Sequence, residues 1–221
     1  MNQLSEGHKE KLRNQIITGA QNYNKFLLNK VFKIVCDDNS TVDIRFFSND
    51  FKHLTGLYSN LSDSEFYNNC CNGHISSGNI ETNQKYNWST LKTKGNHIEN
   101  IQELLYKDGE KILVSEVLDT RTCIFPYAVK NTTNNICVGF VDNINRARSL
   151  RKATNSTNVQ SEKKICAIFA KPRDNDLYNE LVYINTDKKF SEDDSLLQEL
   201  DENVKCKCTQ NFESQKENKS D

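Results

Sequence analysis

The apolar residues of this chain change their spacing close to residue 30, and this change limits the fold more than any other feature of the sequence. Over residues 4–28 they recur at steps of three or four, which is the period of an amphipathic helix. The later apolar runs are short, rich in β-branched and aromatic residues and bounded by turn residues, as strands are. The sequence therefore predicts an α+β fold, in which an N-terminal helix is followed by a small antiparallel sheet with inserted helices.

The expected elements follow from these patterns. Residues 31–36 and 41–47 flank the turn sequence Asp37-Asp38-Asn39-Ser40 and are predicted to form the first hairpin. Helices are expected at residues 48–57, 62–71 and 87–107, and further strands at 111–118, 123–130, 135–141, 164–171 and 180–185. Residues 143–163 show no clear periodicity and are interpreted as a long loop, and loops of that length are commonly functional.

Length and charge predict the domain organisation. A chain of 221 residues suits one domain, and we expect a single domain over residues 1–186 followed by an acidic, flexible extension over 187–221. The net charge of −1 excludes a uniformly basic surface, but residues 143–173 carry eight Lys or Arg against one acid. Such a cluster beside a sheet favours phosphate binding, and a solvated loop of the same composition is the alternative interpretation.

The N-terminus, the cysteines and the standard motifs exclude several classes of protein. No secretory signal and no apolar run of about 18 residues is visible, so we expect a soluble, cytoplasmic chain with no membrane partner. The eight cysteines are expected to be reduced, and neither Cys70–Cys71 nor Cys206–Cys208 has companions at the spacing of a zinc site. The sequence also lacks the P-loop, Rossmann, zincin and nucleophile-elbow motifs.

His53 is the histidine whose neighbours suggest chemistry. It lies in Phe51-Lys52-His53-Leu54-Thr55-Gly56-Leu57, a short predicted helix directly after a strand, at the border of the apolar face. A histidine at such a border is partly desolvated and has a pKa near neutrality, which suits proton transfer. A purely structural histidine is the alternative that the spacing leaves open.

The segment from Phe46 to Leu57 reads F-F-S-N-D-F-K-H-L-T-G-L. It closely resembles the signature of a phage and mobile-element family among the Barnase–EndoU–colicin–RelE-like (BECR) nucleases. Looser similarity follows in the predicted hairpins at 123–140 and 164–181 and in Arg148-Ser149-Leu150-Arg151. The resemblance covers about residues 25–186, implies a BECR-like fold, and leaves the acidic extension unexplained.

The resemblance implies a metal-independent endoribonuclease, in which a ribose 2′-OH attacks the adjacent phosphate and leaves a 2′,3′-cyclic phosphate and a 5′-OH end. Such a reaction needs a base, an acid and cations that stabilise the phosphorane. The implied catalytic residues are His53, Thr55 and Ser149, and the implied substrate-binding residues are Arg45, Arg121, Arg148, Arg151 and Lys171. No metal ion or cofactor is expected.

The resemblance also implies RNA as the partner. The protein would then act as a toxin or as a phage or mobile-element conflict effector, with an immunity or antitoxin protein as a further partner. A non-catalytic RNA-binding or anti-defence module on the same fold is the alternative, because no second histidine is obviously placed to form a pair with His53. A wholly structural role is the third interpretation.

Overall fold

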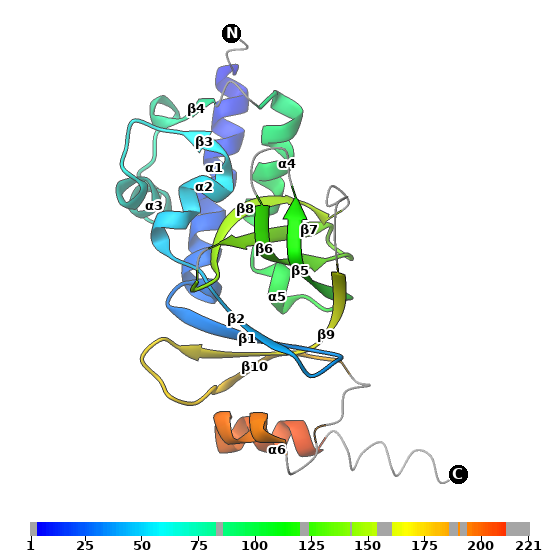
Figure 1. The fold of residues 1–221 in the computed structure, drawn as a ribbon. Helices are drawn as coiled ribbons and strands as arrows, with labels where there is room; N and C mark the ends of the chain where they lie inside the picture. Colours follow the sequence, from blue (N-terminus) through cyan, green and yellow to red (C-terminus); the bar gives the residue numbers. More distant parts are fainter. Residues whose placement is uncertain are drawn as a thin grey trace, which may run out of the picture.

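The computed structural model describes residues 4–82, 86–119, 124–141, 143–153, 161–185, 190 and 194–210. Within them eight strands form one sheet, helices from the first half of the chain cover one of its faces, and a helix near the C-terminus lies against the other (Figure 1). The predicted α+β class is therefore confirmed. None of the helices in this part of the chain is long and apolar enough to cross a membrane.

The N-terminal helix α1 (Glu6–Asn22) begins after Ser5, whose Oγ accepts a hydrogen bond from the backbone N–H of His8 at 3.3 Å. It continues as a π-helical turn, η1 (Tyr23–Leu27). The apolar residues that the spacing places on one face are all buried, namely Leu12, Ile16, Ala20, Tyr23 and Leu27. The prediction of an amphipathic N-terminal helix is confirmed.

The sheet is larger than expected. Its strands are β1 (Lys30–Cys36), β2 (Thr41–Arg45), β5 (Lys111–Asp119), β6 (Ile124–Asn131), β7 (Ile136–Val141), β8 (Arg146–Lys152), β9 (Ser161–Pro172) and β10 (Glu180–Ile184). They follow the order β1-β2-β8-β7-β6-β5-β9-β10, and β1 also pairs with β9. The prediction of a small antiparallel sheet was wrong in size and in one pairing, because β2 and β8 run parallel at the pair Arg45–Arg146.

Strand β8 lies inside the segment that was interpreted as a loop. In the register with β7, Ser149 and Ala147 pair with consecutive residues, so Arg148 is an extra residue that forms a β-bulge. The two buried residues of the strand, Ala147 and Leu150, are consequently three positions apart. Because of the bulge, buried and exposed residues do not alternate with a period of two along β8, and for this reason the strand was not predicted.

Short elements connect β2 to the second half of the sheet. They are η2 (Ser48–Asp50), α2 (Phe51–Thr55), β3 (Leu57–Tyr58), α3 (Asp63–Cys71), η3 (Ser77–Asn79), β4 (Glu81–Thr82), α4 (Trp88–Glu99) and α5 (Glu103–Tyr106). The helix expected at 48–57 is present as η2 and α2 but ends at Thr55, because Gly56 caps it and Leu57 belongs to β3. The helix expected at 62–71 is present and begins at a capping box of Ser62 and Glu65. The helix expected at 87–107 is interrupted between α4 and α5.

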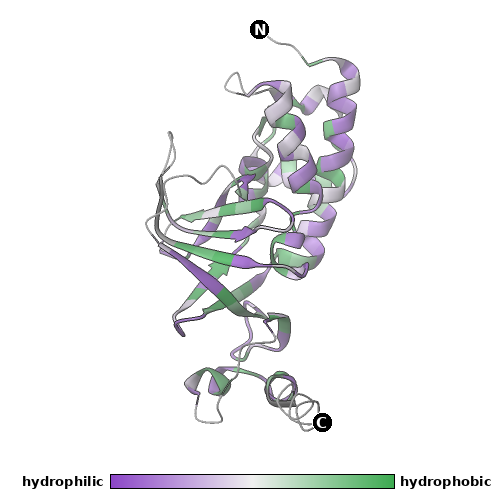
Figure 2. Cartoon of the chain, turned by 90° about the vertical axis from the view of Figure 1, so that its right-hand side faces the viewer, coloured by the Kyte–Doolittle hydropathy of each residue, from purple (hydrophilic) through white to green (hydrophobic). Residues whose placement is uncertain are grey.

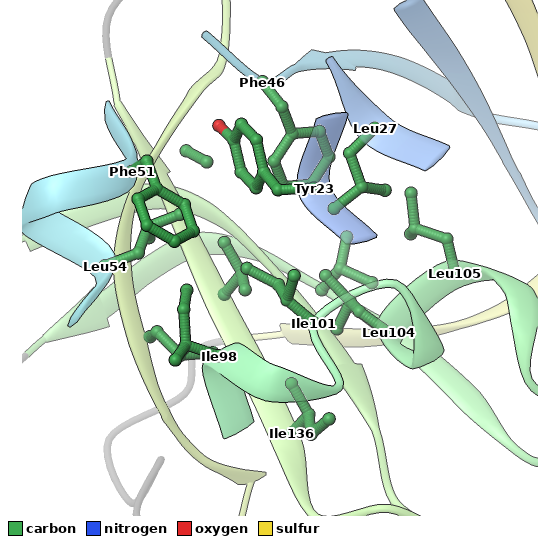
Figure 3. Close-up of a cluster of buried hydrophobic side chains, with 14 of the residues drawn as sticks. Tyr23, Leu27, Phe46, Phe51, Leu54, Ile98, Ile101, Leu104, Leu105 and Ile136 are labelled. Carbon is green, nitrogen blue, oxygen red and sulfur yellow. The ribbon is translucent and has the colours of Figure 1, made fainter. Parts of the chain in front are cut away.

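The main core fixes the segment that precedes α2. The ring of Tyr23 lies 5.8 Å from that of Phe46 and 5.4 Å from that of Phe51, in edge-to-face geometry (Figure 3). Its hydroxyl donates a hydrogen bond to the carbonyl of Phe47 at 2.9 Å. The backbone from β2 into α2 is therefore held by a buried aromatic cluster.

A second, smaller core lies on the opposite face of the sheet. There η5 (Ser195–Glu199) and α6 (Glu202–Gln210) pack apolar side chains against Val31, Phe169 and Tyr178. Hydrophobic stretches in the strands are interspersed with hydrophilic ones (Figure 2). The described part of the acidic extension is thus packed against the sheet.

Candidate active site

The candidate site lies where β2 and β8 part. The backbone N–H of Arg45 donates to the carbonyl of Asn145 at 3.0 Å, next to the parallel pair of Arg45 with Arg146. After this bridge the chain leaves β2 and turns into η2 and α2, which pack against β8. The start of β8 and the residues around α2 are thereby brought together.

A buried ion pair between Asp50 and Arg146 joins η2 to the start of β8. The Asp50 side chain is fully buried and accepts hydrogen bonds from Nε of Arg146 at 2.9 Å and from its Nη2. Burial raises the pKa of Asp50, and the guanidinium of Arg146 opposes this effect. Within the described residues the second carboxylate oxygen, Oδ2, has no hydrogen-bond partner. The pair fixes Arg146 beside α2.

His53 lies on the exposed side of α2, with 38% of its side chain accessible. Burial and then the charge of Arg148 lower the pKa of His53, whereas Asp63 and Asp50 raise it. Nε2 of His53 lies 3.5 Å from Oδ2 of Asp63. Lys52 places Asp63, because its Nζ lies 3.1 Å from Oδ1 of Asp63. Since the net shift is downward from an ordinary value of about 6.5, the imidazole is largely neutral at pH 7 and can accept a proton.

Arg148 is the bulged residue of β8 and is exposed. It forms no hydrogen bond or ion pair with any residue that the structure describes, but its charge acts on the pKa values of both His53 and Asp50. Bulges often redirect a side chain beside an active site. Arg148 is therefore a cation close to His53 that is available for an anionic ligand.

Two further guanidinium groups lie on the ring of Phe47. Cζ of Arg173 is 4.0 Å from the centre of this ring and Cζ of Arg146 is 5.4 Å from it. Arg173 comes from the turn between β9 and β10, and its Nη2 reaches the carbonyl of Phe46 at 3.5 Å. Positive charge from β8 and from the turn between β9 and β10 thus gathers around the start of α2.

Thr55 is placed at the end of α2, and its side chain is engaged with the backbone. Its hydroxyl donates to the carbonyl of Lys52 at 2.6 Å and accepts from the N–H of Leu57 at 3.1 Å. The residue is buried, and the following Gly56 ends the helix with a left-handed φ of 72°. These contacts shape the helix that carries His53.

The structure does not bring Ser149 and Arg151 to His53. Arg151 pairs with Cys137 of β7, and its Cζ lies 5.6 Å from the ring of Phe125, on the face of β8 opposite Ala147 and Leu150. Its Nη2 donates to Oγ of Ser149 at 2.9 Å. Both side chains therefore belong to a neighbouring region of the same strand.

Arg45 and Lys171 lie on the opposite face of the sheet from α2. Each pairs with Val31, which belongs to the second core. Nζ of Lys171 donates to the carbonyl of Asp176 at 2.7 Å and lies 4.7 Å from the ring of Tyr178. Arg121, the remaining substrate-binding residue of the sequence analysis, lies outside the described residues.

No role was expected for Asp50 or Asp63, and Arg146 and Arg173 were expected only as members of the basic segment 143–173. Asp50 precedes His53 by three positions and Arg146 belongs to the basic segment, but only the fold shows that the two are paired. The described residues contain no group of three or more His, Cys, Asp and Glu side chains that could hold a metal ion.

An α+β domain that presents a neutral histidine beside arginine side chains has groups suited to cleaving phosphodiesters, as nucleases do. Residues 15–187 match the model of the family described as phage-Barnase-EndoU-ColicinE5/D-RelE like nuclease 4, PBECR4. The chain belongs to this nuclease family, and the resemblance to BECR nucleases is confirmed. No curated protein and no solved structure matches the chain.

Proposed function

We propose that the protein is a metal-independent endoribonuclease that cleaves RNA by attack of a ribose 2′-OH on the adjacent phosphate. The observation that carries this proposal is the position of His53, which is accessible on α2 with Nε2 3.5 Å from Oδ2 of Asp63, and whose pKa is lowered by burial and by the charge of Arg148. A neutral imidazole can take the proton of the 2′-OH, and an adjacent guanidinium can stabilise the negative charge that then develops on phosphorus-bound oxygens. The membership of a nuclease family supports the same reaction class.

In this mechanism His53 is the base. Asp63 faces Nε2 and favours the tautomer with hydrogen on that atom, so Nδ1 accepts the proton. The 2′-oxygen bonds to phosphorus, the bond from phosphorus to the 5′-oxygen breaks, and the leaving oxygen takes a proton from protonated His53 or from water. The products are a 2′,3′-cyclic phosphate and a 5′-OH end.

The other groups have supporting roles. Arg148 binds the reacting phosphate, because it is exposed and forms no ion pair within the described chain. Asp50 is a positioning residue, because its carboxylate holds the guanidinium of Arg146 beside α2. Arg173 and the ring of Phe47 add a cationic and aromatic surface for a neighbouring nucleotide.

The test compares the wild type with His53→Gln on tRNA and rRNA in EDTA, with the ends mapped for cyclic phosphate. His74→Gln is the matched control, because His74 is also exposed but lies outside the site. We expect His53→Gln to lower kcat/KM by roughly 10²–10⁴ and the control to leave it unchanged.

Three further results would decide between the alternatives. An RNA with a 2′-deoxy nucleotide at the cleaved position should resist cleavage, since it lacks the nucleophile. A strict requirement for Mg²⁺, or equal cleavage of that substituted RNA, would contradict the mechanism. RNA binding without cleavage by the folded wild type would favour the non-catalytic RNA-binding module.

A further inference from the structure

The short helix α2 is attached to β8 at both of its ends, and His53 lies midway between the two attachments. At the start of the helix, the N-cap residue Asp50 forms the buried ion pair with Arg146. At its end, the C-cap residue Gly56 contacts Lys94 of α4, and Lys94 in turn bonds to β8. The first attachment is direct, whereas the second passes through a side chain from a third element.

Lys94 lies between the backbone at the end of α2 and the backbone of β8. A Cβ atom on Gly56 would be 2.7 Å from Cδ of Lys94 and 3.1 Å from Cε2 of Tyr86, so both side chains pack directly on this glycine. Beyond the aliphatic stem, Nζ of Lys94 donates a hydrogen bond to the carbonyl of Leu150 at 2.6 Å. One side chain therefore connects the two elements.

The ammonium group of Lys94 is buried among neutral groups. Only 9% of the residue is exposed, and Nζ lies 5.5 Å from the centre of the Tyr86 ring in addition to its bond with the Leu150 carbonyl. A buried ammonium costs more free energy than an apolar side chain of similar length, such as methionine. The hydrogen bond to β8 explains why a lysine is used here. Because the side chain is buried, it acts through α2 and not by touching a substrate.

The two attachments enclose the functional residues of both elements. On α2, His53 is three residues from each attached end. On β8, Arg148 is midway between the attached residues Arg146 and Leu150. The charge of Arg148 acts on the pKa of His53, as expected for neighbouring groups. Holding α2 on β8 at both ends therefore fixes the distance between this imidazole and this guanidinium.

We propose that Lys94 is a positioning residue, which holds the end of α2 against β8 and thereby sets the distance between His53 and Arg148. The inference rests on the proposed function, in which these two groups act on the same phosphate. A base and a phosphate-binding cation accelerate the reaction only when both are correctly placed, and a displacement of about 1 Å can lower a rate by roughly 10²-fold.

The test uses Lys94→Met, which keeps the length and the apolar stem of the side chain but removes the donor to Leu150. Lys92→Met is the matched control, because Lys92 lies on the same helix and is exposed. The first measurement is kcat and KM on RNA at a temperature where circular dichroism shows that every variant is folded. The second is the pKa of His53 from an NMR titration, in each protein with and without Arg148→Ala.

We expect Lys94→Met to lower kcat/KM by roughly 10–100-fold, mainly through kcat, and the control to leave it unchanged. Arg148→Ala should raise the pKa of His53 by less in the Lys94→Met protein than in the wild type, because the two groups are no longer held together. The lost charge of Lys94 does not produce this difference, since it acts on His53 equally with and without Arg148. A purely structural role would lower the melting temperature and leave the response of His53 to Arg148→Ala unchanged.

Tyr86→Leu is the second variant, because Tyr86 packs on the same glycine but is only half-buried, so its replacement is better tolerated. It should produce both changes in smaller size, and it decides the question if Lys94→Met does not fold. If the folded variants keep the wild-type kcat/KM and the full response of His53 to Arg148→Ala, the inference is wrong, while cleavage by the wild type leaves the proposed function standing. If the wild type cleaves no RNA, the proposed function is overturned, and the titrations still decide whether Lys94 positions His53 beside Arg148.

Discussion

His53 is held between charges of opposite sign, and each of them has a separate effect on its titration. The Arg148 guanidinium lowers the pKa of His53, whereas the Asp63 carboxylate raises it. A base is active when it is deprotonated, so kcat/KM should rise with pH through the pKa of His53, with an inflection below about 6.5 in the wild type. Arg148→Ala should move this inflection to higher pH, and Asp63→Asn should move it to lower pH.

The measurement is a pH profile of kcat/KM, together with an NMR titration of the His53 ring in each variant. The titration reports the pKa even where Arg148→Ala has slowed the reaction. Displacement of the pKa in the same direction by both variants would contradict the assigned arrangement of charges. Lys11→Gln, on α1, is the control that should leave the pKa of His53 in place.

His97 supports a prediction about folding stability. Burial first, and then Lys152 and Lys94, lower its pKa from 6.5 to about 4. The unfolded chain therefore binds this proton at a higher pH than the folded chain does. The stability that neutral His97 contributes is present above pH 6.5 and is lost as the pH falls toward 4.

Urea unfolding at pH 7 and pH 5 tests this sign. His97→Gln should lose less stability between the two pH values than the wild type loses, whereas His74→Gln should behave as the wild type because His74 is exposed. An equal loss in the wild type and in His97→Gln would show that His97 is not desolvated in the folded protein.

At the scale of the element, the end of α2 depends on Thr55. Its hydroxyl is the acceptor for the buried N–H of Leu57. Thr55→Val removes this acceptor and should lower the free energy of unfolding by about 1–3 kcal/mol, whereas Thr55→Ser keeps the hydroxyl and should cost less. Thermal melts measure the stability. Activity should stay within a few-fold of the wild type at a temperature where the variant is folded, and a folded but inactive Thr55→Val would instead identify Thr55 as catalytic.

Local patterns were sufficient to predict most elements but not the composition of the site. The burial period of α1 and the hairpins of the second half are short-range signals, and they were read correctly from the sequence. Strand β8 was not, because its bulge at Arg148 breaks the alternation. The pairing of Asp50 with Arg146 joins residues 96 positions apart and has no local signal.

The alternation of side chains between the two faces of a strand explains why Arg45 and Lys171 lie away from His53. Arg45 and Lys171 pair with the same residue, Val31, from the two strands that flank β1. Side chains that share a pair share a face of the sheet, so both are on the side of the second core. A shift of one residue in either strand would have turned the side chain toward α2, and the sequence alone did not fix that register.

For the whole molecule, the pairings of β1 with both β2 and β9 close seven strands into a circuit, β1-β2-β8-β7-β6-β5-β9. The closing contact on one side is the parallel pair Arg45–Arg146, beside which the candidate site lies. The two faces of the sheet consequently have different roles: one carries α2 and His53, and the other is covered by η5 and α6.

This division predicts that stability and activity can be separated. Leu200 is fully buried in the second core, and its neighbours Glu199 and Asp201 form backbone hydrogen bonds with Tyr178, both of 2.9 Å. Leu200→Ala should lower the free energy of unfolding by about 2–5 kcal/mol, because it opens a cavity in that core. The second core lies across the sheet from His53, so kcat/KM should stay within about twofold of the wild-type value at temperatures below the melting transition. A two-state denaturation curve gives the folded fraction at those temperatures.

Leu177→Ala is the matched control, because 43% of Leu177 is exposed and its truncation should change stability by less than about 0.5 kcal/mol. Chemical denaturation gives the stability, and initial rates on RNA give the activity. A stable, folded Leu200→Ala protein without activity would place the C-terminal layer in the functional site. A large loss of stability with retained activity would instead show that the acidic extension acts as part of the folded scaffold, on the face away from the chemistry.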